Sequence, residues 1–269
     1  MLTDVYTQGI DGNVNARLRA AAEFVAARFD YEERDMPLVC ADVGADHAYL
    51  SIYLVLHGIC GRVYATEINE LPAKKAVRNI SQMPDVKVQK ADGSTQTVPL
   101  GSLISVHVTD GLCGMQDKGI NRAVVCGMGG EVIAGIIDRA QFLKHDRVKL
   151  VLQPMSKEME LREYLCDNGF HITEEKLLRD TGRIYTVMSV VYDGEKRKLS
   201  PAQLMLGKSI IEHFTQDSDV SASQLEMFSE LVERKLGHAE NKLKSQHAGH
   251  DDRMLFEELS KIKDSLPQA

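Results

Sequence analysis

Residues 38–55 read LVCADVGADHAYLSIYLV, and this stretch decides the fold that the sequence predicts. An apolar run of strand length ends at Val43, and an apolar run that suits a helix begins near Tyr49. Gly44 and Asp46 lie between them. Open α/β sheets bind ligands at the carboxyl ends of their strands, so this turn is the first candidate for a binding loop. It holds one glycine instead of G-x-G-x-x-G and is therefore a poor cradle for a pyrophosphate.

Further short apolar runs predict a parallel sheet. The expected strands are LVCADV (38–43), RVYATEI (62–68), AVVCGM (123–128) and KLVLQ (149–153). Helix-like stretches separate them, which is the pattern of a parallel sheet covered by helices. One more strand is expected between Val86 and Val108, where VKVQKA and LISVHV are both candidates. The turn-rich stretch DGSTQTVPLGS between them is predicted to be an inserted hairpin or loop.

Two β-rich segments end this α/β region. HITEEKLL (171–178) and IYTVMSVVY (184–192) are separated by RDTGR, which has the composition of a turn. We expect an antiparallel hairpin that closes the parallel sheet. By analogy of fold, such an ending is typical of class I methyltransferases, whereas a nicotinamide-binding domain does not need it.

The chain changes character after Asp193. Ser200-Pro201 has the composition of a helix cap and first turn, and apolar residues then recur every three or four positions. We expect two or three amphipathic helices packed as an antiparallel, coiled-coil-like hairpin, with its turn in SQHAGHDD (245–252). The predicted division is an α/β domain at 1–193 and a helical domain at 194–269. A packing or dimerisation role for these helices and a role in substrate binding are both open.

Composition and charge exclude several classes of protein. A net charge of −7 and a pI of about 5.7 argue against a protein that is basic over its whole surface, as nonspecific nucleic-acid binders are. The five cysteines are odd in number and never spaced C-x-x-C, so neither a disulfide framework nor a metal site is expected. No apolar run has membrane-spanning length, and the first residues lack the layout of a signal peptide. We therefore expect a cytoplasmic protein.

Three further segments suit a nucleoside ligand. Glu67 lies at the end of the second predicted strand, 23 residues after Gly44, where a carboxylate accepts hydrogen bonds from both ribose hydroxyls of an adenine nucleoside. Asp110 lies in VTDGL, and the run CGMGGE (126–131) brings glycines that permit close backbone contact with a ligand. S-adenosylmethionine has no phosphates, so the single-glycine loop suits it better than a dinucleotide.

Taken together, these segments resemble the bacterial tRNA (adenine-22-N1)-methyltransferases. The segments that carry the resemblance are Asn15-Ala16-Arg17-Leu18, ADVGADHAYLSIYLV (41–55), TEINELPAKKAVRNI (66–80), TDGL (109–112), CGMGGEVIAGII (126–137), LQPMSKEMELREYLCDNGFHITEE (152–175) and TGRIYTVMSV (181–190). The resemblance implies a class I, Rossmann-like methyltransferase sheet with a C-terminal coiled-coil-like domain. It also implies an enzyme that uses S-adenosylmethionine to methylate N1 of adenine 22 in tRNA.

The resemblance implies roles for particular residues. The expected S-adenosylmethionine site comprises Asp42, Gly44, Asp46, His47, Glu67, Asn69, Asp110, Gly111, Gly127, Met128 and Gly129. The expected catalytic residues are Asp46, His47, Arg17, Gln153 and Pro154. Arg17 is expected to face the cofactor or the target nucleotide, with a purely structural pairing to an acid as the open alternative. Gln153-Pro154 is expected to lie beside the transferable methyl group. The sequence departs from the family at Met155, where relatives usually have asparagine, and in extra residues before Asp110.

The implied chemistry depends mainly on positioning. N1 of adenine has a lone pair and attacks the methyl group without a general base, so alignment at short distance supplies most of the acceleration. The product base is a cation, which a carboxylate such as Asp46 would stabilise. N1 lies on the Watson–Crick edge, so the target adenine must be unpaired or extruded. For His47, orienting Asp46, binding the base and a structural role are all open.

Recognition of tRNA also needs positive surface. The candidate cations are Lys74, Lys75, Arg78, Lys196, Arg197, Lys198, Arg234, Lys235, Lys242 and Lys244. Two other functions stay open. One is a class I methyltransferase with a small-molecule or protein acceptor, which the acidic net charge permits. The other, a nucleotide-binding oxidoreductase or sensor, is disfavoured by the missing glycines.

Overall fold

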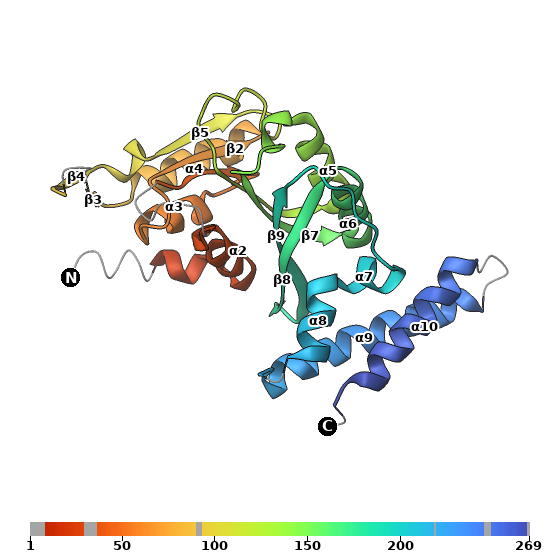
Figure 1. Ribbon diagram of the computed structural model, residues 1–269. Coiled ribbons are helices and arrows are strands. Elements are labelled where there is room, and N and C mark those ends of the chain that lie inside the picture. The colour runs from red at the N-terminus through yellow and green to blue at the C-terminus, as the bar shows by residue number, and fades with distance from the viewer. Residues whose placement is uncertain (1–8, 30–36, 90–92, 218, 245–248, 268–269) are drawn as a thin grey trace.

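A seven-stranded sheet forms the centre of the protein (Figure 1). The computed structural model describes residues 9–29, 37–89, 93–217, 219–244 and 249–267. The strands of the sheet follow the order β5-β2-β1-β6-β7-β9-β8, and β9 runs antiparallel to both of its neighbours. Their bounds are β1 Val39–Val43, β2 Arg62–Glu67, β5 Ile104–Val108, β6 Arg122–Gly129, β7 Lys149–Ser156, β8 Phe170–Asp180 and β9 Arg183–Tyr192.

Helices cover both faces of this sheet. They are α2 Ala16–Ala26, α3 Tyr49–Leu56, α4 Glu70–Ser81, α5 Gly130–Arg139 and α6 Glu158–Asp167. Neighbouring residues of one strand enter different cores: Val124 packs with α2, α3 and α4, whereas Val125 packs with α5 and α6. This alternation is what a strand buried on both faces requires. The predicted Rossmann-like class I sheet is thus confirmed.

The segment between the predicted strands RVYATEI (62–68) and AVVCGM (123–128) forms two separate parts. LISVHV supplies β5, which pairs in parallel with β2 at the edge of the sheet. VKVQ forms β3 (Val86–Gln89), which pairs with β4 (Thr95–Val98) in a separate antiparallel hairpin. Residues 90–92 of the predicted insertion lie outside the described residues. Because the hairpin precedes the first residue of β5, it lies at the amino end of that strand, opposite to the edge where ligands bind.

The terminal hairpin is also confirmed. β8 and β9 pair antiparallel from Phe170↔Tyr192 to Asp180↔Arg183. The connecting residues Thr181 and Gly182 have φ angles of 46° and 78°. A two-residue turn with two positive φ angles matches the twist of the strands that it joins.

The chain beyond Asp193 forms four helices within its described part, where the sequence predicted two or three. They are α7 Pro201–Leu206, α8 Lys208–Gln216, α9 Ala222–Leu243 and α10 His250–Ser265. α9 and α10 lie side by side and antiparallel (Figure 1), as the ion pairs Lys242–Asp252 and Glu233–Lys263 require. Residues 245–248 of the predicted turn lie outside the described residues. None of the described helices is both long and apolar enough to cross a membrane.

A buried ion pair joins these helices to the sheet. Arg162 of α6 and Glu175 of β8 are 2.8 Å apart, and each side chain is 1% exposed. Arg162 Nη1 also donates to the carbonyls of Leu204 and Met205 on α7, at 2.7 and 3.3 Å. The helices therefore pack against β8 as well as on one another. The division between residues 193 and 194 stays a prediction.

Candidate active site

The loop after β1 joins the carboxyl ends of two strands. The amides of Gly44 and Ala45 both donate to the carbonyl of Thr66, at 2.8 and 3.0 Å. Gly44 has a φ angle of 71°, and a Cβ atom there would lie 2.2 Å from Cε of Met128. A side chain at position 44 would thus be strained and would displace Met128. Glycine is the residue that this turn requires.

A cavity of about 130 Å³ opens beside this loop. Its lining comes from α2, from the end of β1 and the following loop, from α3 and from the end of β6: Leu18, Asp42, Val43, Gly44, Ala45, Asp46, His47, Tyr49, Leu50 and Cys126. Four residues predicted for the cofactor site, Asp42, Gly44, Asp46 and His47, therefore lie on one cavity wall.

Glu67 is held at the end of β2 by backbone amides. Its Oε2 accepts from the amide of Asp46 at 3.2 Å, and its Oε1 accepts from the amides of Ile68 and Asn69 at 3.0 and 3.3 Å. The residue is 9% exposed. The amide of Thr109 donates to the Glu67 carbonyl at 2.9 Å, so the loop after β5 is fixed to the same point. The carboxylate is oriented before any ligand binds.

Asp42 is a buried acid in the wall of the cavity. Burial raises the pKa of its carboxyl to about 6, although the hydrogen bond from Ser51 opposes this shift. The Ser51 hydroxyl donates to Oδ2 of Asp42 at 2.6 Å. A buried carboxylate that is ionised near pH 7 is stabilised by a cation beside it, because the positive charge offsets the free-energy cost of removing the carboxylate from water.

Asp46 and His47 lie at the mouth of the cavity. The Asp46 side chain is 64% exposed, and its Oδ2 is 3.6 Å from Nε2 of His47. Asp46 has a φ angle of 48°, which Asp and Asn tolerate better than most residues. The His47 ring stacks on Tyr49 with a centroid distance of 5.5 Å. Both side chains are accessible to a ligand.

The ends of β6 and β7 form the other side of the rim. Gly127 has a φ angle of 79°, and Gly129 is the N-cap of α5. Gln153 is fully buried on β7, where its Nε2 donates to the carbonyl of Pro154 at 2.6 Å. Arg17 of α2 donates from Nη1 to Oε1 of Gln153 at 3.3 Å. The structure thus brings Arg17 and Gln153, both predicted as catalytic residues, into contact.

The model of the TrmK family, described as tRNA (adenine(22)-N(1))-methyltransferase, matches residues 40–264. The chain belongs to this family. The family membership that the sequence predicted is thereby confirmed.

Relatives from other bacteria support the assignment. The Bacillus subtilis tRNA (adenine(22)-N(1))-methyltransferase is 31% identical over 163 residues, which cover 58% of this chain and 62% of that relative. A Streptococcus pneumoniae protein provisionally described as a tRNA (m1A22) methyltransferase is 27% identical, with a TM-score of 0.67 over 94% of this chain and 100% of that chain. It was also solved in complex with S-adenosyl-L-methionine. The Bacillus subtilis TrmK structure, 23% identical with a TM-score of 0.64 over 93% and 96% of the two chains, shares the fold.

The other predicted residues lie outside the lining of this cavity. Asp110 Oδ1 accepts from Arg139 of α5 at 3.1 Å. Gly111 has a φ angle of 58° and packs against Ile136, whose Cγ2 would lie 3.2 Å from an added Cβ. This loop is therefore fixed to α5. The remaining predicted residues outside the lining are Arg17, Glu67, Asn69, Gly127, Met128, Gly129, Gln153 and Pro154. The roles of all these residues stay predictions.

Apolar side chains that were not predicted for the site are exposed beside Glu67. Ile68, Leu71 and Val108 are 62%, 73% and 55% exposed. Val108 is the register partner of Glu67 on β5, and Ile68 follows Glu67 directly. Exposed apolar groups around a carboxylate suit the flat face of a nucleobase. The sequence feature that could have indicated them is Ile68, an apolar residue directly after Glu67 at the end of β2.

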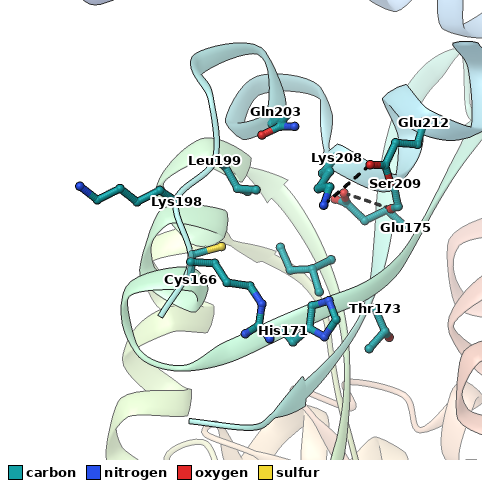
Figure 2. Close-up of a pocket in the computed structure, with 12 residues that line it drawn as sticks. Cys166, His171, Thr173, Glu175, Lys198, Leu199, Gln203, Lys208, Ser209 and Glu212 are labelled. Atoms are coloured by element: carbon teal, nitrogen blue, oxygen red, sulfur yellow. Dashed lines mark hydrogen bonds and ion pairs between the residues drawn. The ribbon is translucent and has the colours of Figure 1, made fainter. Parts of the chain in front are cut away.

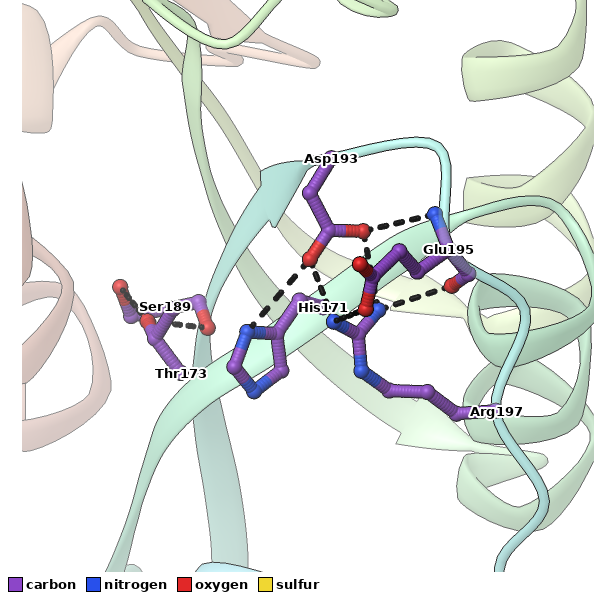
Figure 3. A network of polar contacts seen from close by, with 6 residues as sticks. All are labelled: His171, Thr173, Ser189, Asp193, Glu195 and Arg197. Carbon is purple, nitrogen blue, oxygen red and sulfur yellow. Dashed lines mark hydrogen bonds and ion pairs between the residues drawn. The ribbon is translucent and has the colours of Figure 1, made fainter.

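A larger cavity, of about 560 Å³, lies against β8 and the helices that follow it (Figure 2). Its lining contains none of the residues predicted for the cofactor site or for catalysis, although it includes the candidate tRNA-binding cations Arg197 and Lys198. Arg197 in this lining bonds to Asp193 and Glu195 (Figure 3), and Lys208 lies 3.8 Å from Glu212. These cations are already paired. The larger volume of this cavity therefore does not make it the better candidate for the active site.

The structure divides the candidate tRNA-binding cations into two groups, with Lys235 in neither. Those with acidic partners are Lys74, Arg197, Lys242 and Lys244. Burial lowers the pKa of Lys235, and the charge of Glu158 opposes this shift. Those exposed without an ion pair to any described residue are Lys75, Arg78, Lys196, Lys198 and Arg234. α9 and α10 together hold nine acidic and six basic residues, and four of the five candidates without an ion pair to a described residue lie instead on α4 or at positions 196 and 198.

Proposed function

We propose that the protein transfers a methyl group from S-adenosylmethionine to N1 of adenine 22 in tRNA. Membership of the TrmK family supports this proposal, as does the S-adenosyl-L-methionine bound to the Streptococcus pneumoniae relative. The observation that carries it is the Glu67 carboxylate, held at the rim by three backbone amides with apolar side chains exposed beside it. This arrangement suits the ribose and adenine of the cofactor.

The residues at the rim fit S-adenosylmethionine. Glu67 would accept from the ribose hydroxyls, and Ile68 and Val108 would contact the adenine face. When bound, the cofactor supplies a methyl group on a positively charged sulfonium. Asp42 and Asp46, in the lining of the adjacent cavity, would offset that charge.

The chain's own residues act by position and charge. The acceptor nitrogen uses its lone pair, so no side chain has to remove a proton before attack. Arg17 and Gln153 meet at the carboxyl end of β7, where they would orient the target nucleotide. Asp46 is exposed at the cavity mouth and would stabilise the methylated base, which is a cation.

Asp46→Asn is expected to lower kcat by about tenfold to a hundredfold and to change the affinity for S-adenosylmethionine much less. The carboxylate would act mainly on charge that develops in the transition state, and asparagine keeps its shape and tolerates its φ angle. Steady-state kinetics with tRNA and calorimetry with the cofactor separate the two effects. Equal losses in kcat and affinity would make Asp46 a cofactor ligand only.

Cofactor affinity is expected to fall about tenfold between pH 7 and pH 5. Burial raises the pKa of Asp42 to about 6, and a cationic ligand beside it favours the ionised carboxylate. Below pH 6, binding must therefore release a proton, whereas above pH 7 it does not. Calorimetry across this range measures the dependence, and Asp42→Asn should remove it. A wild-type affinity that is constant from pH 5 to pH 7 would contradict this role of Asp42.

Mapping of methylated adenosines in unmodified tRNA tests the proposed function directly. The purified protein with S-adenosylmethionine is expected to produce 1-methyladenosine at position 22. An A22→G transcript is the control and should stay unmethylated. Cofactor binding without methylation of any tRNA would instead favour a small-molecule or protein acceptor. We place the reaction in the cytoplasm, with the tRNA that it modifies.

A further inference from the structure

Arg17, in the first turn of α2, is held by side chains from the far end of the sheet. Its Nε donates to Oδ2 of Asp180 at 2.8 Å, and its guanidinium carbon is 4.9 Å from the centre of the Tyr185 ring. Its Nη1 contacts Gln153 and the sulfur of Met155. The side chains of Arg17 and Asp180 are 20% and 11% exposed, so their ion pair is largely shielded from solvent.

Asp180 owes its position to the turn of the terminal hairpin. It is the last residue of β8 and the register partner of Arg183 on β9. Thr181 and Gly182 connect the two strands with positive φ angles, which makes the turn tight. This turn places Asp180 against α2, although 163 positions separate it from Arg17 along the chain.

The ion pair lies beside the candidate cofactor cavity. Leu18, the neighbour of Arg17, lines that cavity. Gln153 is the register partner of Cys126, which lines it as well. Burial raises the pKa of the Cys126 thiol, and the charge of Arg17 opposes that shift, as expected for a nearby cation. Arg17 thus lies where β7 ends at the cavity.

These contacts leave part of the guanidinium available to a ligand. Among the described residues, Nη2 of Arg17 has no hydrogen-bond partner. Its two N–H groups suit a phosphate oxygen or a ring nitrogen of adenine other than N1. A long arginine side chain has many rotamers, and the ion pair restricts them before the substrate binds.

We propose that Asp180 is a positioning residue for the methyl transfer. It fixes the guanidinium of Arg17 beside Gln153, so that Nη2 meets the target nucleotide in one orientation. The inference rests on the proposed function, because it concerns the same acceptor. Asp180 acts through Arg17 and does not itself contact the substrate.

Substitutions of Asp180 test this role. Asp180→Ala is expected to lower kcat/KM for tRNA by about tenfold to a hundredfold, while the cofactor dissociation constant changes less than about twofold. In an Arg17→Gln background, Asp180→Ala should cause no further loss, because the two residues act as one unit. Asp180→Glu, which keeps the charge, is expected to recover part of the activity. The melting temperature of each variant is measured alongside.

Lys176→Gln is the matched control. It breaks the exposed Lys176–Glu23 ion pair, which joins the same β8 and α2, and should leave methylation unchanged. Losses that add independently for Arg17 and Asp180, or that only follow the melting temperature, would overturn the inference, as would full activity of Asp180→Ala. If the wild-type protein binds the cofactor but methylates no tRNA, the proposed function fails and this inference fails with it.

Discussion

Glu67→Ala is expected to raise the dissociation constant for S-adenosylmethionine by about 10²-fold to 10⁴-fold. Two ribose hydroxyls would lose a charged acceptor, and each such hydrogen bond contributes about 1.5 to 3 kcal/mol. The substitution also removes the acceptor of the Asp46, Ile68 and Asn69 amides, so the loop after β1 loses a group that orders it. Isothermal titration calorimetry measures the change directly.

Two further variants make this result specific. Glu67→Gln keeps the shape of the side chain and one acceptor oxygen, so an intermediate loss is expected. Glu70→Gln alters an acid at the start of α4 that is 71% exposed and paired with Lys74, and it should leave the affinity unchanged. Unchanged affinity in Glu67→Ala would remove Glu67 from the cofactor site, whatever the outcome with tRNA.

Arg162→Met is expected to lower the free energy of unfolding by about 3 to 5 kcal/mol. Arg162 and Glu175 are both buried, and the substitution leaves the Glu175 carboxylate without its counterion. Burial already raises the pKa of Glu175, and Arg162 is the group that opposes this shift most strongly. The carbonyl of Leu204 loses its donor as well, which loosens α7 from the sheet. Urea denaturation followed by circular dichroism measures the loss.

A double substitution separates the buried charge from the packing. Arg162→Met with Glu175→Leu removes both charges and should recover a large part of the stability, because no unpaired ion is left in the interior. The control is Arg179→Gln, which breaks the exposed Arg179–Glu230 pair between β8 and α9 and should have little effect. If Arg162→Met costs no more than this control, the pair does not hold the helices to the sheet.

Most strands were predictable because parallel strands buried on both faces are short, continuous apolar runs. The choice between VKVQKA and LISVHV was not, since both are β-rich and a local pattern does not name the partner strand. The structure places the second in the sheet beside β2, and the described part of the first, VKVQ, in a separate hairpin. Gly207, with a φ angle of 96°, separates α7 from α8, whereas the apolar periodicity of the sequence alone would predict one continuous helix there.

The candidate site shows the same division. The residues after β1 and at the end of β2 were identified because acids and glycines at strand ends share one rim. The exposed apolar residues beside Glu67 were not predicted, because the sequence alone does not show whether an isoleucine is buried or exposed. Lys242 and Lys244 were predicted as candidate tRNA-binding cations, yet in the structure Lys242 pairs with Asp252 and Lys244 with Glu240.

Local composition and spacing were enough to predict the α/β class, the closing hairpin, the C-terminal helices and the acids and glycines of the rim. These features depend on neighbouring residues and on the edge at which each strand ends. The partners of the charged side chains follow from packing instead. Arg17 meets Asp180 across 163 positions, and Arg162 meets Glu175 and α7 only because α6, β8 and α7 pack together. Such contacts depend on how whole elements are arranged in space, and no local pattern in the chain encodes that arrangement.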